Sequence, residues 1–324
     1  MAHVTFIHGI GQKPANAPLL NIWRRALARS RPDDHPATRL AEAVDQIDLG
    51  AEGVHSSMVY WTDVLYPAPD LNVAAHESRE EFEALGSDVS VLGELVTLNH
   101  AEDPLWLASL AGKLYLQEQM QEVVTEPQPD ASLDQKERIL LPWVIKQRFL
   151  SAFLRDVHHY LFDVQHEPRA GEVYHVRQEI RRRFVEQLQA ATAKGSPQVV
   201  ISHSMGTVIA YDCLKNMPEC PRIDALITLG SPLGIDEVQD KLASGWSRHD
   251  GFPREKVGEW INIFDRLDVV CALDPMLAND FKLAGMGKVH DIDEPNYGRW
   301  RHSLGKYFEG PQLRRVLRRL LRLR

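Results

Sequence analysis

Residues 198–210 read Gln198-Val199-Val200-Ile201-Ser202-His203-Ser204-Met205-Gly206-Thr207-Val208-Ile209-Ala210. A β-branched apolar run, a turn of small residues and an apolar-periodic segment, in that order, predict a strand, a sharp turn and a helix. Ser204 lies at the apex of the turn, where a strained backbone exposes a serine hydroxyl as a nucleophile. Gly206 lets the helix pack closely on the strand, and Ser202 keeps a small side chain on the other side of the apex. The pattern favours a catalytic serine over an ordinary strand, turn and helix of an α/β sheet, which can share this sequence.

A second short motif follows the first predicted strand, which covers residues 4–7, and it reads His8-Gly9-Ile10-Gly11. Two glycines that flank one residue let the backbone approach a substrate and present an N–H group to it, as an oxyanion hole requires. Ile10 would supply that N–H group. A phosphate-binding loop fits less well because no Lys-Ser or Lys-Thr pair follows, and a plain glycine turn after a buried strand is the other alternative.

The rest of the chain alternates strand and helix patterns on both sides of one long interruption. Strands are predicted at residues 57–65, 224–229, 260–264 and 288–292, and helices at residues 19–29, 173–193 and 311–323. This alternation predicts an α/β fold with a small, mostly parallel sheet of about six strands that is flanked by helices.

Residues 66–170 form the interruption, because they are acid-rich, carry few strand signals and show helical periodicity. We therefore expect a large helical cap inserted into a core that comprises residues 1–65 and 171–324. The adjacent His158 and His159 would point about 100° apart on a helix and could not hold one metal ion together. Several aromatic side chains of the insertion could line an acyl pocket, although packing is their more common role: Trp106, Tyr115, Trp143, Phe149, Phe153, Tyr160 and Phe162.

The composition limits the classes of function that fit the chain. Its 324 residues are 44% hydrophobic, which is enough for one large core with an insertion. A net charge of −8 argues against a nucleic-acid-binding protein, which needs a concentrated basic face. Three cysteines, Cys213, Cys220 and Cys271, are expected to be free thiols in a reducing compartment. The N-terminus has no signal-peptide pattern and no apolar run approaches the roughly 20 residues of a membrane helix, so we expect a cytoplasmic protein.

The flanking segments together resemble the α/β-hydrolase superfamily, in its serine esterase and lipase-like branch. The resemblance covers about residues 2–65 and 171–324 and does not include the insertion. It rests on five short stretches: His8-Gly9-Ile10-Gly11, Ser202-His203-Ser204-Met205-Gly206, Gly230-Ser231-Pro232, Asp268-Val269-Val270 and His302-Ser303. The chain departs from the family in two ways: Ser202 stands where the family has its first elbow glycine, and the family's first strands are missing from the pattern. The second departure is why a small sheet of about six strands is expected.

In this family the chain order is serine, then acid, then histidine, each on a loop after a strand. Only His290 and His302 follow the acid candidates, and His302 is favoured because it lies on the predicted loop before the last helix, where the family keeps its base. Asp268 is favoured as the acid because it resembles the family's Asp-x-Val. Asp265 stays open as the alternative, although it directly abuts its strand and Arg266 beside it is an expected ion-pair partner.

The resemblance implies a serine hydrolase that cleaves a carboxylic ester, including a lipid acyl ester, through an acyl-enzyme. Ser204 would be the nucleophile, His302 the base and Asp268 the acid that orients the base. The backbone N–H groups of Ile10 and Met205 would form the oxyanion hole. No metal or organic cofactor is required by this chemistry, and the expected partner is a small acyl ester rather than a nucleic acid.

Three further interpretations stay open at this point. Acyl transfer or thioester cleavage could use the same triad, and a non-catalytic protein of this fold could bind a partner through the insertion. The basic amphipathic helix at residues 311–323 could touch an anionic membrane surface, although covering the sheet is its favoured role. His203 is expected to pack or line the pocket, because its side chain should diverge from that of Ser204.

Overall fold

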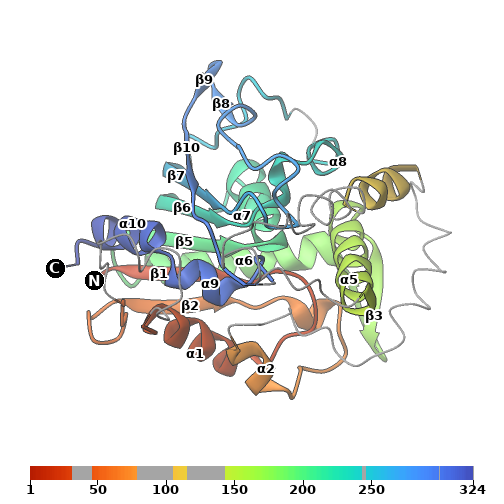
Figure 1. Cartoon of the computed structure of the whole chain (residues 1–324), viewed down its shortest axis with the longest axis horizontal. Helices are drawn as coiled ribbons and strands as arrows, with labels where there is room; N and C mark the ends of the chain where they lie inside the picture. The colour runs from red at the N-terminus through yellow and green to blue at the C-terminus, as the bar shows by residue number, and fades with distance from the viewer. Residues whose placement is uncertain (31–45, 79–104, 115–142, 243–245, 299, 324) are drawn as a thin grey trace, which may run out of the picture.

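The computed structural model describes residues 1–30, 46–78, 105–114, 143–242, 246–298 and 300–323, with the backbone alone for residues 143–150 (Figure 1). Six parallel strands form one sheet in the order β10-β7-β6-β5-β1-β2. An α/β chain with a mostly parallel six-stranded sheet was expected from the sequence, and this architecture is confirmed. The strands are β1 (His3–Ile7), β2 (His55–Val59), β5 (Gln198–His203), β6 (Ile223–Leu229), β7 (Val257–Phe264) and β10 (Val289–Asp293).

The central strands are buried on both faces, because helices cover each side of the sheet. In β5, Val200 packs into one hydrophobic cluster whereas Val199 and Ile201 pack into another. This alternation follows from the strand period of two residues, which sends neighbouring side chains to opposite faces. The continuous apolar runs that predicted buried strands are therefore explained by burial from both sides.

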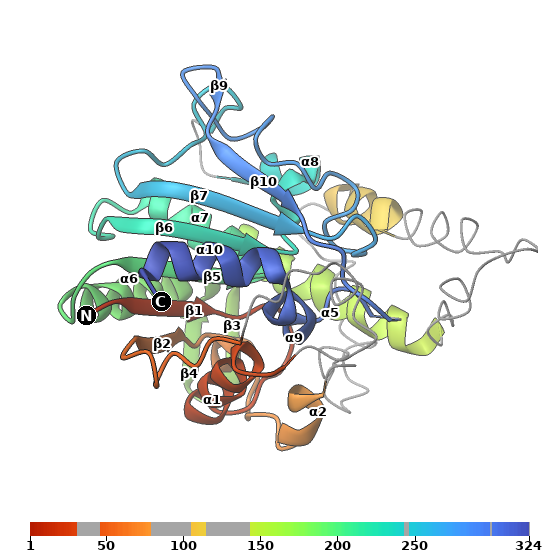
Figure 2. The ribbon, with the colours of Figure 1, turned by 60° about the vertical axis from the view of Figure 1, so that its left-hand side comes forward.

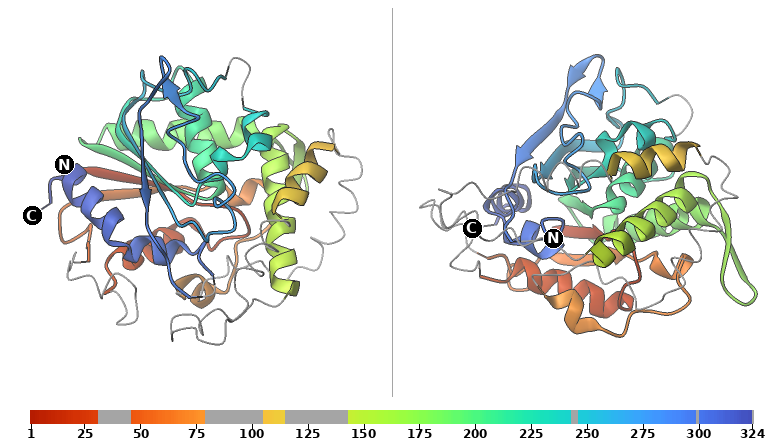
Figure 3. Two further views of the ribbon diagram at one scale, coloured as in Figure 1. Left: turned by 45° about the horizontal axis from the view of Figure 1, so that its top comes forward. Right: turned by 45° about the vertical axis from the view of Figure 1, so that its right-hand side comes forward.

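Two sets of helices form the outer layers (Figure 3). One face is covered by α1 (Asn16–Leu27), α9 (Leu304–Glu309) and α10 (Pro311–Leu321). The other carries α6 (Val176–Thr192) and α7 (Met205–Asn216), and α5 (Trp143–Leu161) packs against α6. The shorter helices are η2 (Thr62–Val64), α2 (Val73–Glu77), η5 (Pro232–Gly234) and α8 (Asp236–Gln239). Two hairpins complete the fold. One joins β3 (Gln165–Arg169) to β4 (Glu172–His175), and the other joins β8 (Lys282–Leu283) to β9 (Met286–Gly287).

The basic helix α10 covers the sheet, as the sequence favoured, and Figure 2 shows it lying across the strands. Leu313 and Leu317 are fully buried in the cluster on that face. Arg314 is also buried and donates hydrogen bonds to the carbonyl oxygens of Leu27 and Arg29, at 3.3 and 2.6 Å. The apolar side of this amphipathic helix is therefore occupied by the protein's own core.

The second strand is shorter than the sequence predicts, because β2 ends at Val59 and not at residue 65. It pairs with β1 only from His55 opposite His3 to Val59 opposite Ile7, so pairing stops where β1 stops. The apolar residues that follow turn into η2 and pack in the core, with Trp61 fully buried. Their apolar character reflects this packing rather than a continued strand.

The interval 66–170 combines helices with a strand, whereas the sequence predicted a helical segment. Among its described residues, α2, residues 105–114 and α5 are helical, but β3 pairs with β4 across the expected boundary at residues 170 and 171. Gly171 has a φ of +81°, which provides the turn of this hairpin. The two strands are polar, so they lack the apolar alternation by which strands are recognised in a sequence.

Helix α5 lies beyond the carboxyl ends of the sheet strands (Figures 1 and 2). Trp106, Phe153 and Tyr160 belong to the same hydrophobic cluster as the sheet, and Phe162 packs against that cluster. These aromatic residues of the insertion therefore serve the packing role. Tyr115 and the side chains of Trp143 and Phe149 lie outside the described residues.

The three cysteines are buried and free, as the sequence predicts. Burial raises the pKa values of the Cys213 and Cys271 thiols well above their ordinary value. Within the described segments, we find no helix with the length and apolar character needed to cross a membrane.

Candidate active site

Ser204 occupies a strained turn between β5 and α7, as the sequence predicts for a nucleophile elbow. Its φ of 55° and ψ of −132° lie in a region that residues with a side chain rarely adopt. The Ser204 N–H group donates to the carbonyl of Leu229 at 3.0 Å, which fixes the turn to the end of β6. The neighbouring Ser202 hydroxyl donates to the carbonyl of Ile227 at 2.9 Å and is thus committed to the sheet.

Gly206 is required by the close approach of α7 to the end of β1. A Cβ atom at this position would lie 2.6 Å from the carbonyl oxygen of His8 and 2.7 Å from that of Ile7. Because these are backbone atoms, no side-chain rotation relieves the contact. The same packing brings the elbow beside the His8-Gly9-Ile10-Gly11 turn, so the two motifs meet at the carboxyl ends of the neighbouring strands β5 and β1.

His302 and Asp268 form a fully buried hydrogen-bonded pair. The His302 Nδ1 atom lies 2.8 Å from each carboxylate oxygen of Asp268. Burial alone would raise the pKa of Asp268, but the contact with His302 and hydrogen bonds from Tyr307 and Val270 outweigh it and lower this pKa. Asp268 is therefore held as a carboxylate that orients the imidazole.

Asp265, the alternative acid, contacts other groups. Its carboxylate accepts hydrogen bonds from the backbone N–H groups of Leu267 and Asn296, each at 2.8 Å, and forms an ion pair with Arg301 at 3.1 Å. The expected partnership with Arg266 is wrong, because Arg266 lies over the surface and pairs with Asp293. Asp265 thus fixes the shape of the loop that carries His302 without touching the imidazole.

The alternative base, His290, lies inside β10 and is exposed. His302 lies on the loop between β10 and α9, where the family resemblance placed the base. The geometry therefore joins Asp268 to His302 and leaves His290 and Asp265 outside the pair.

Gly230 brings the Asp268–His302 pair to the end of β6, to which Ser204 is bonded, although no hydrogen bond joins Ser204 Oγ to His302. It follows Leu229, whose carbonyl binds the Ser204 N–H group, and it has a φ of +52°. A Cβ atom on Gly230 would lie 2.7 Å from Asp268 Oδ2 and 3.0 Å from His302 Nδ1. The absence of a side chain here lets the acid and the imidazole approach the elbow.

Two supporting residues were not predicted from the sequence in these roles. Tyr307 on α9 donates its hydroxyl to Asp268 Oδ2 at 2.7 Å and accepts from the Asp265 N–H group at 3.2 Å. His203 packs as expected, but specifically against His302, with ring centroids 4.6 Å apart. Its Nε2 atom donates to the His302 carbonyl at 3.1 Å. Both contacts restrain the position of the imidazole.

The Ser204 hydroxyl is fully buried and has no hydrogen-bond partner among the residues that the structure describes. A buried hydroxyl without a partner is unfavourable by about 1–3 kcal/mol. Catalytic hydrogen bonds are often unformed until substrate binds. The lone hydroxyl on a strained backbone is thus more consistent with reactivity than with a structural role.

The predicted oxyanion donors lie on the two motifs that meet at this edge. Within the described part of the chain, no acceptor is found for the N–H group of Ile10 or that of Met205. Met205 opens α7, where first-turn N–H groups lack intrahelical acceptors. The next N–H group along the turn, that of Gly11, already donates to Asp156 of α5 at 2.9 Å. The geometry therefore leaves Ile10 and Met205 available to bind a substrate oxygen.

His8 holds the glycine turn in place as a neutral imidazole. Its Nδ1 atom donates to the Gly9 carbonyl at 2.8 Å, and its Nε2 atom accepts from the Trp61 N–H group at 3.2 Å. Its ring also stacks on the Trp61 indole, with centroids 4.7 Å apart. Burial lowers the pKa of His8 to about 3, and the positive charge of Lys13 contributes to this shift.

This low pKa makes stability depend on pH. Below the ordinary His pKa of 6.5 the unfolded chain binds a proton, whereas folded His8 stays neutral until about pH 3, so stability falls as the pH falls through this window. From pH 7 to pH 5 we expect His8 alone to remove about 2 kcal/mol. Urea unfolding of wild type and His8→Gln at both pH values measures this, because glutamine retains a donor and an acceptor. Equal losses in the two proteins would contradict the expectation.

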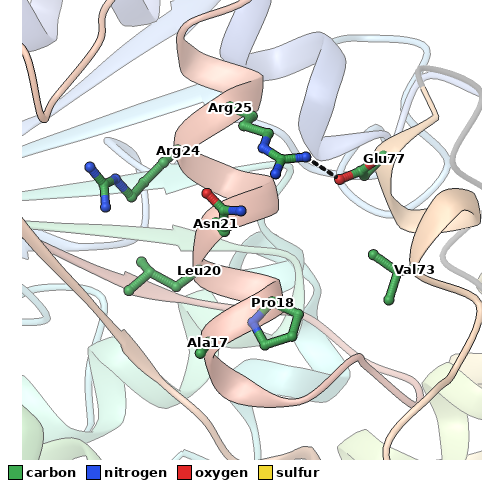
Figure 4. A pocket seen from close by; sticks show the side chains of 8 residues that line it. All are labelled: Ala17, Pro18, Leu20, Asn21, Arg24, Arg25, Val73 and Glu77. Carbon is green, nitrogen blue, oxygen red and sulfur yellow. Dashed lines mark hydrogen bonds and ion pairs between the residues drawn. The ribbon is translucent and has the colours of Figure 1, made fainter.

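A surface pocket lies elsewhere, between α1 and α2 (Figure 4). Arg25 and Glu77 form an ion pair at its edge, with Nη1 and Oε1 2.8 Å apart. None of the residues that line it belongs to the candidate site. The surface hollow and the buried Ser204 are therefore separate features.

Comparisons with known proteins leave the function open. No family model matches the chain, and no curated protein matches it. One similar solved structure is the crystal structure of an uncharacterized protein from Pseudomonas aeruginosa, with 9% sequence identity and a TM-score of 0.27. The alignment covers 97% of this chain and 47% of that chain, so this protein spans about half the length of the matched one. At this similarity the comparison carries no argument, and the functional inference rests on the site itself.

Proposed function

We propose that the protein is a serine hydrolase of the α/β-hydrolase type that cleaves a carboxylic ester through an acyl-enzyme. Two observations carry the proposal: a buried Asp268–His302 pair that lies against Gly230, and a strained serine that is bonded through its N–H group to the adjacent Leu229 and whose hydroxyl has no partner among the described residues. A structural serine would be expected to use its hydroxyl in a hydrogen bond. Ser204 instead combines backbone strain with a hydroxyl that no described residue binds. Activation requires a hydrogen bond from this hydroxyl to His302, which the structure does not form and which the proposal expects when substrate binds.

In the proposed reaction, the Ser204 oxygen attacks the ester carbonyl carbon while His302 Nε2 takes the hydroxyl proton. Asp268 holds the proton on His302 Nδ1, so the other ring nitrogen is the one that accepts. The N–H groups of Ile10 and Met205 stabilise the negative oxygen that forms. The imidazolium then protonates the leaving alcohol, and a water molecule, activated by the same imidazole, releases the acid.

Asp156 couples the insertion to this chemistry. It lies on α5, and its carboxylate accepts from the Gly11 N–H group next to the proposed Ile10 donor. Arg155 and the Tyr66 hydroxyl hold the same carboxylate, with contacts of 2.8 and 3.1 Å. Movement of α5 would thus be transmitted directly to the oxyanion turn. This contact supports the cap role expected for the insertion, because the fully buried Ser204 must become accessible for turnover.

Reaction with a small fluorophosphonate tests the proposal directly. We expect one covalent adduct per chain, located on Ser204 by peptide mapping, because only an activated serine attacks this reagent rapidly. The Ser202→Ala variant is the matched control and should still be labelled, whereas Ser204→Ala should not. Labelling of another serine, or none under conditions that label a known serine esterase, would contradict the proposal and favour a non-catalytic binding protein.

A further inference from the structure

Lys13 is a buried lysine beside the proposed oxyanion turn, in a position that the proposed mechanism does not use. Its side chain belongs to a residue that is only 4% exposed. The Nζ atom lies 4.0 Å from the point where a Cβ atom on Gly11 would be placed. The ammonium group thus folds back toward the turn that carries the Ile10 N–H group, although the Nζ atom itself is not among the fully buried atoms.

This ammonium group has no counter-charge within the described parts of the chain. No carboxylate there lies at ion-pair distance from Lys13 Nζ, and no acceptor at hydrogen-bond distance. Asp156, which contacts the neighbouring Gly11, is already bound by Gly11, Arg155 and Tyr66. Asp70, whose N–H group donates to the Lys13 carbonyl, has its carboxylate paired with His76. Lysine is almost never buried without a partner, because desolvating a charge costs several kcal/mol.

The positive charge of Lys13 acts on two histidines that support the candidate site. Burial is the main cause of the low pKa values of His8 and His203, and the positive charge of Lys13 lowers both further. His8 holds the oxyanion turn, and His203 stacks on His302.

We infer that Lys13 binds an anionic group of the substrate, so that the ester carries a carboxylate or phosphate a few bonds from the scissile carbonyl. The inference deepens the proposed function, since it assigns a substrate class to the same serine site. A bound anion would complete the missing ion pair and offset the cost of burying the ammonium group. A neutral long-chain ester would leave that charge unpaired.

Paired esters test this substrate class and show which side carries the anion. In the first pair, mono-4-nitrophenyl glutarate carries a negative charge on its acyl side and 4-nitrophenyl pentanoate is its neutral counterpart. In the second pair, 2-phosphoethyl butyrate carries a negative charge on its alcohol side and 2-methoxyethyl butyrate is neutral. In Lys13→Met, we expect the ratio of kcat/KM for the anionic over the neutral ester to fall about 30-fold in one pair, as for the loss of a charged hydrogen bond. Lys13→Arg should restore part of the ratio. Lys215→Met, which removes a partly exposed lysine bonded to the Asp250 carbonyl, should leave it unchanged.

A binding measurement separates this inference from the proposed catalytic role. We expect glutarate or inorganic phosphate to raise the Tm of Ser204→Ala, and to have no such effect when Lys13→Met is added. Anion binding that depends on Lys13, without any turnover or labelling, would reject the serine hydrolase and keep the anion site. The anion site would be overturned, and the hydrolase kept, if Ser204 is labelled but Lys13→Met leaves the ratio of kcat/KM for the anionic over the neutral ester unchanged. An equal fall of kcat/KM for both esters of each pair would have the same meaning.

Discussion

Ser204→Ala is expected to lower kcat for ester hydrolysis by about 10⁶-fold, the scale found when a triad nucleophile is removed. The reason is that Ser204 supplies the oxygen of the acyl-enzyme through which the proposed reaction proceeds. Residual turnover would come from attack by a water molecule on a substrate whose carbonyl oxygen is bound by the proposed oxyanion donors Ile10 and Met205. Initial rates on a 4-nitrophenyl ester, with the variant purified on unused resin to exclude wild-type carry-over, measure the loss.

The same variant should not lose stability. Wild-type Ser204 buries a hydroxyl that has no hydrogen-bond partner among the described residues, and its removal relieves a desolvation penalty of about 1–3 kcal/mol. The backbone strain at φ 55° remains, because alanine also carries a Cβ atom. We therefore expect an equal or higher free energy of unfolding in urea.

Ser202→Ala provides the matched comparison, two residues before Ser204 and within β5. Its hydroxyl donates to the Ile227 carbonyl, so its removal should cost about 1 kcal/mol of stability while most of the activity is retained. We therefore expect Ser204→Ala to lose activity and keep its stability, and Ser202→Ala to lose stability and keep most of its activity. This difference would distinguish a catalytic hydroxyl from a structural one. If Ser204→Ala retains turnover, or if it loses more stability than Ser202→Ala, the assignment of the nucleophile fails.

The elbow could be predicted because its determinants are local. Strand, turn and helix occupy thirteen consecutive residues, and the need for Gly206 follows from backbone packing at the turn. The parallel sheet was also predictable, because buried strands appear as apolar runs. The polar hairpin of β3 and β4 lacks that signal, and the 3₁₀ turn after β2 depends on where its neighbour β1 ends.

The remaining site residues depend on contacts that no sequence pattern records. Asp268 and His302 lie 34 positions apart, and only the chain order of a resembled family pointed to them. Arg301, the ion-pair partner of Asp265, lies on a loop that shows no periodicity. Tyr307, which donates to Asp268, lies on a helix of six residues, which is too short to show any. Lys13 is an ordinary charged residue until its burial is known.

Asp268→Asn is expected to lower kcat by about 10⁴-fold, because the amide changes the proton arrangement on His302. Wild-type Asp268 accepts the proton of Nδ1 and also accepts from Tyr307 and Val270. An asparagine would turn one accepting oxygen into a donating amide, which favours an imidazole protonated at Nε2. That nitrogen could then no longer accept the proton of Ser204, so fluorophosphonate labelling should slow by a similar factor.

Asp265→Asn distinguishes this tautomer effect from damage to the loop. It weakens the contact with Arg301 but leaves the Asp268–His302 pair in place, so we expect a stability loss of about 1–3 kcal/mol and kcat within about tenfold of wild type. Steady-state kinetics and urea unfolding on both variants give the comparison. A larger fall in kcat for Asp265→Asn than for Asp268→Asn would reverse the choice of acid. Equal losses would mean that both carboxylates act only by holding the loop, since a tautomer effect can arise only from the acid that contacts the imidazole.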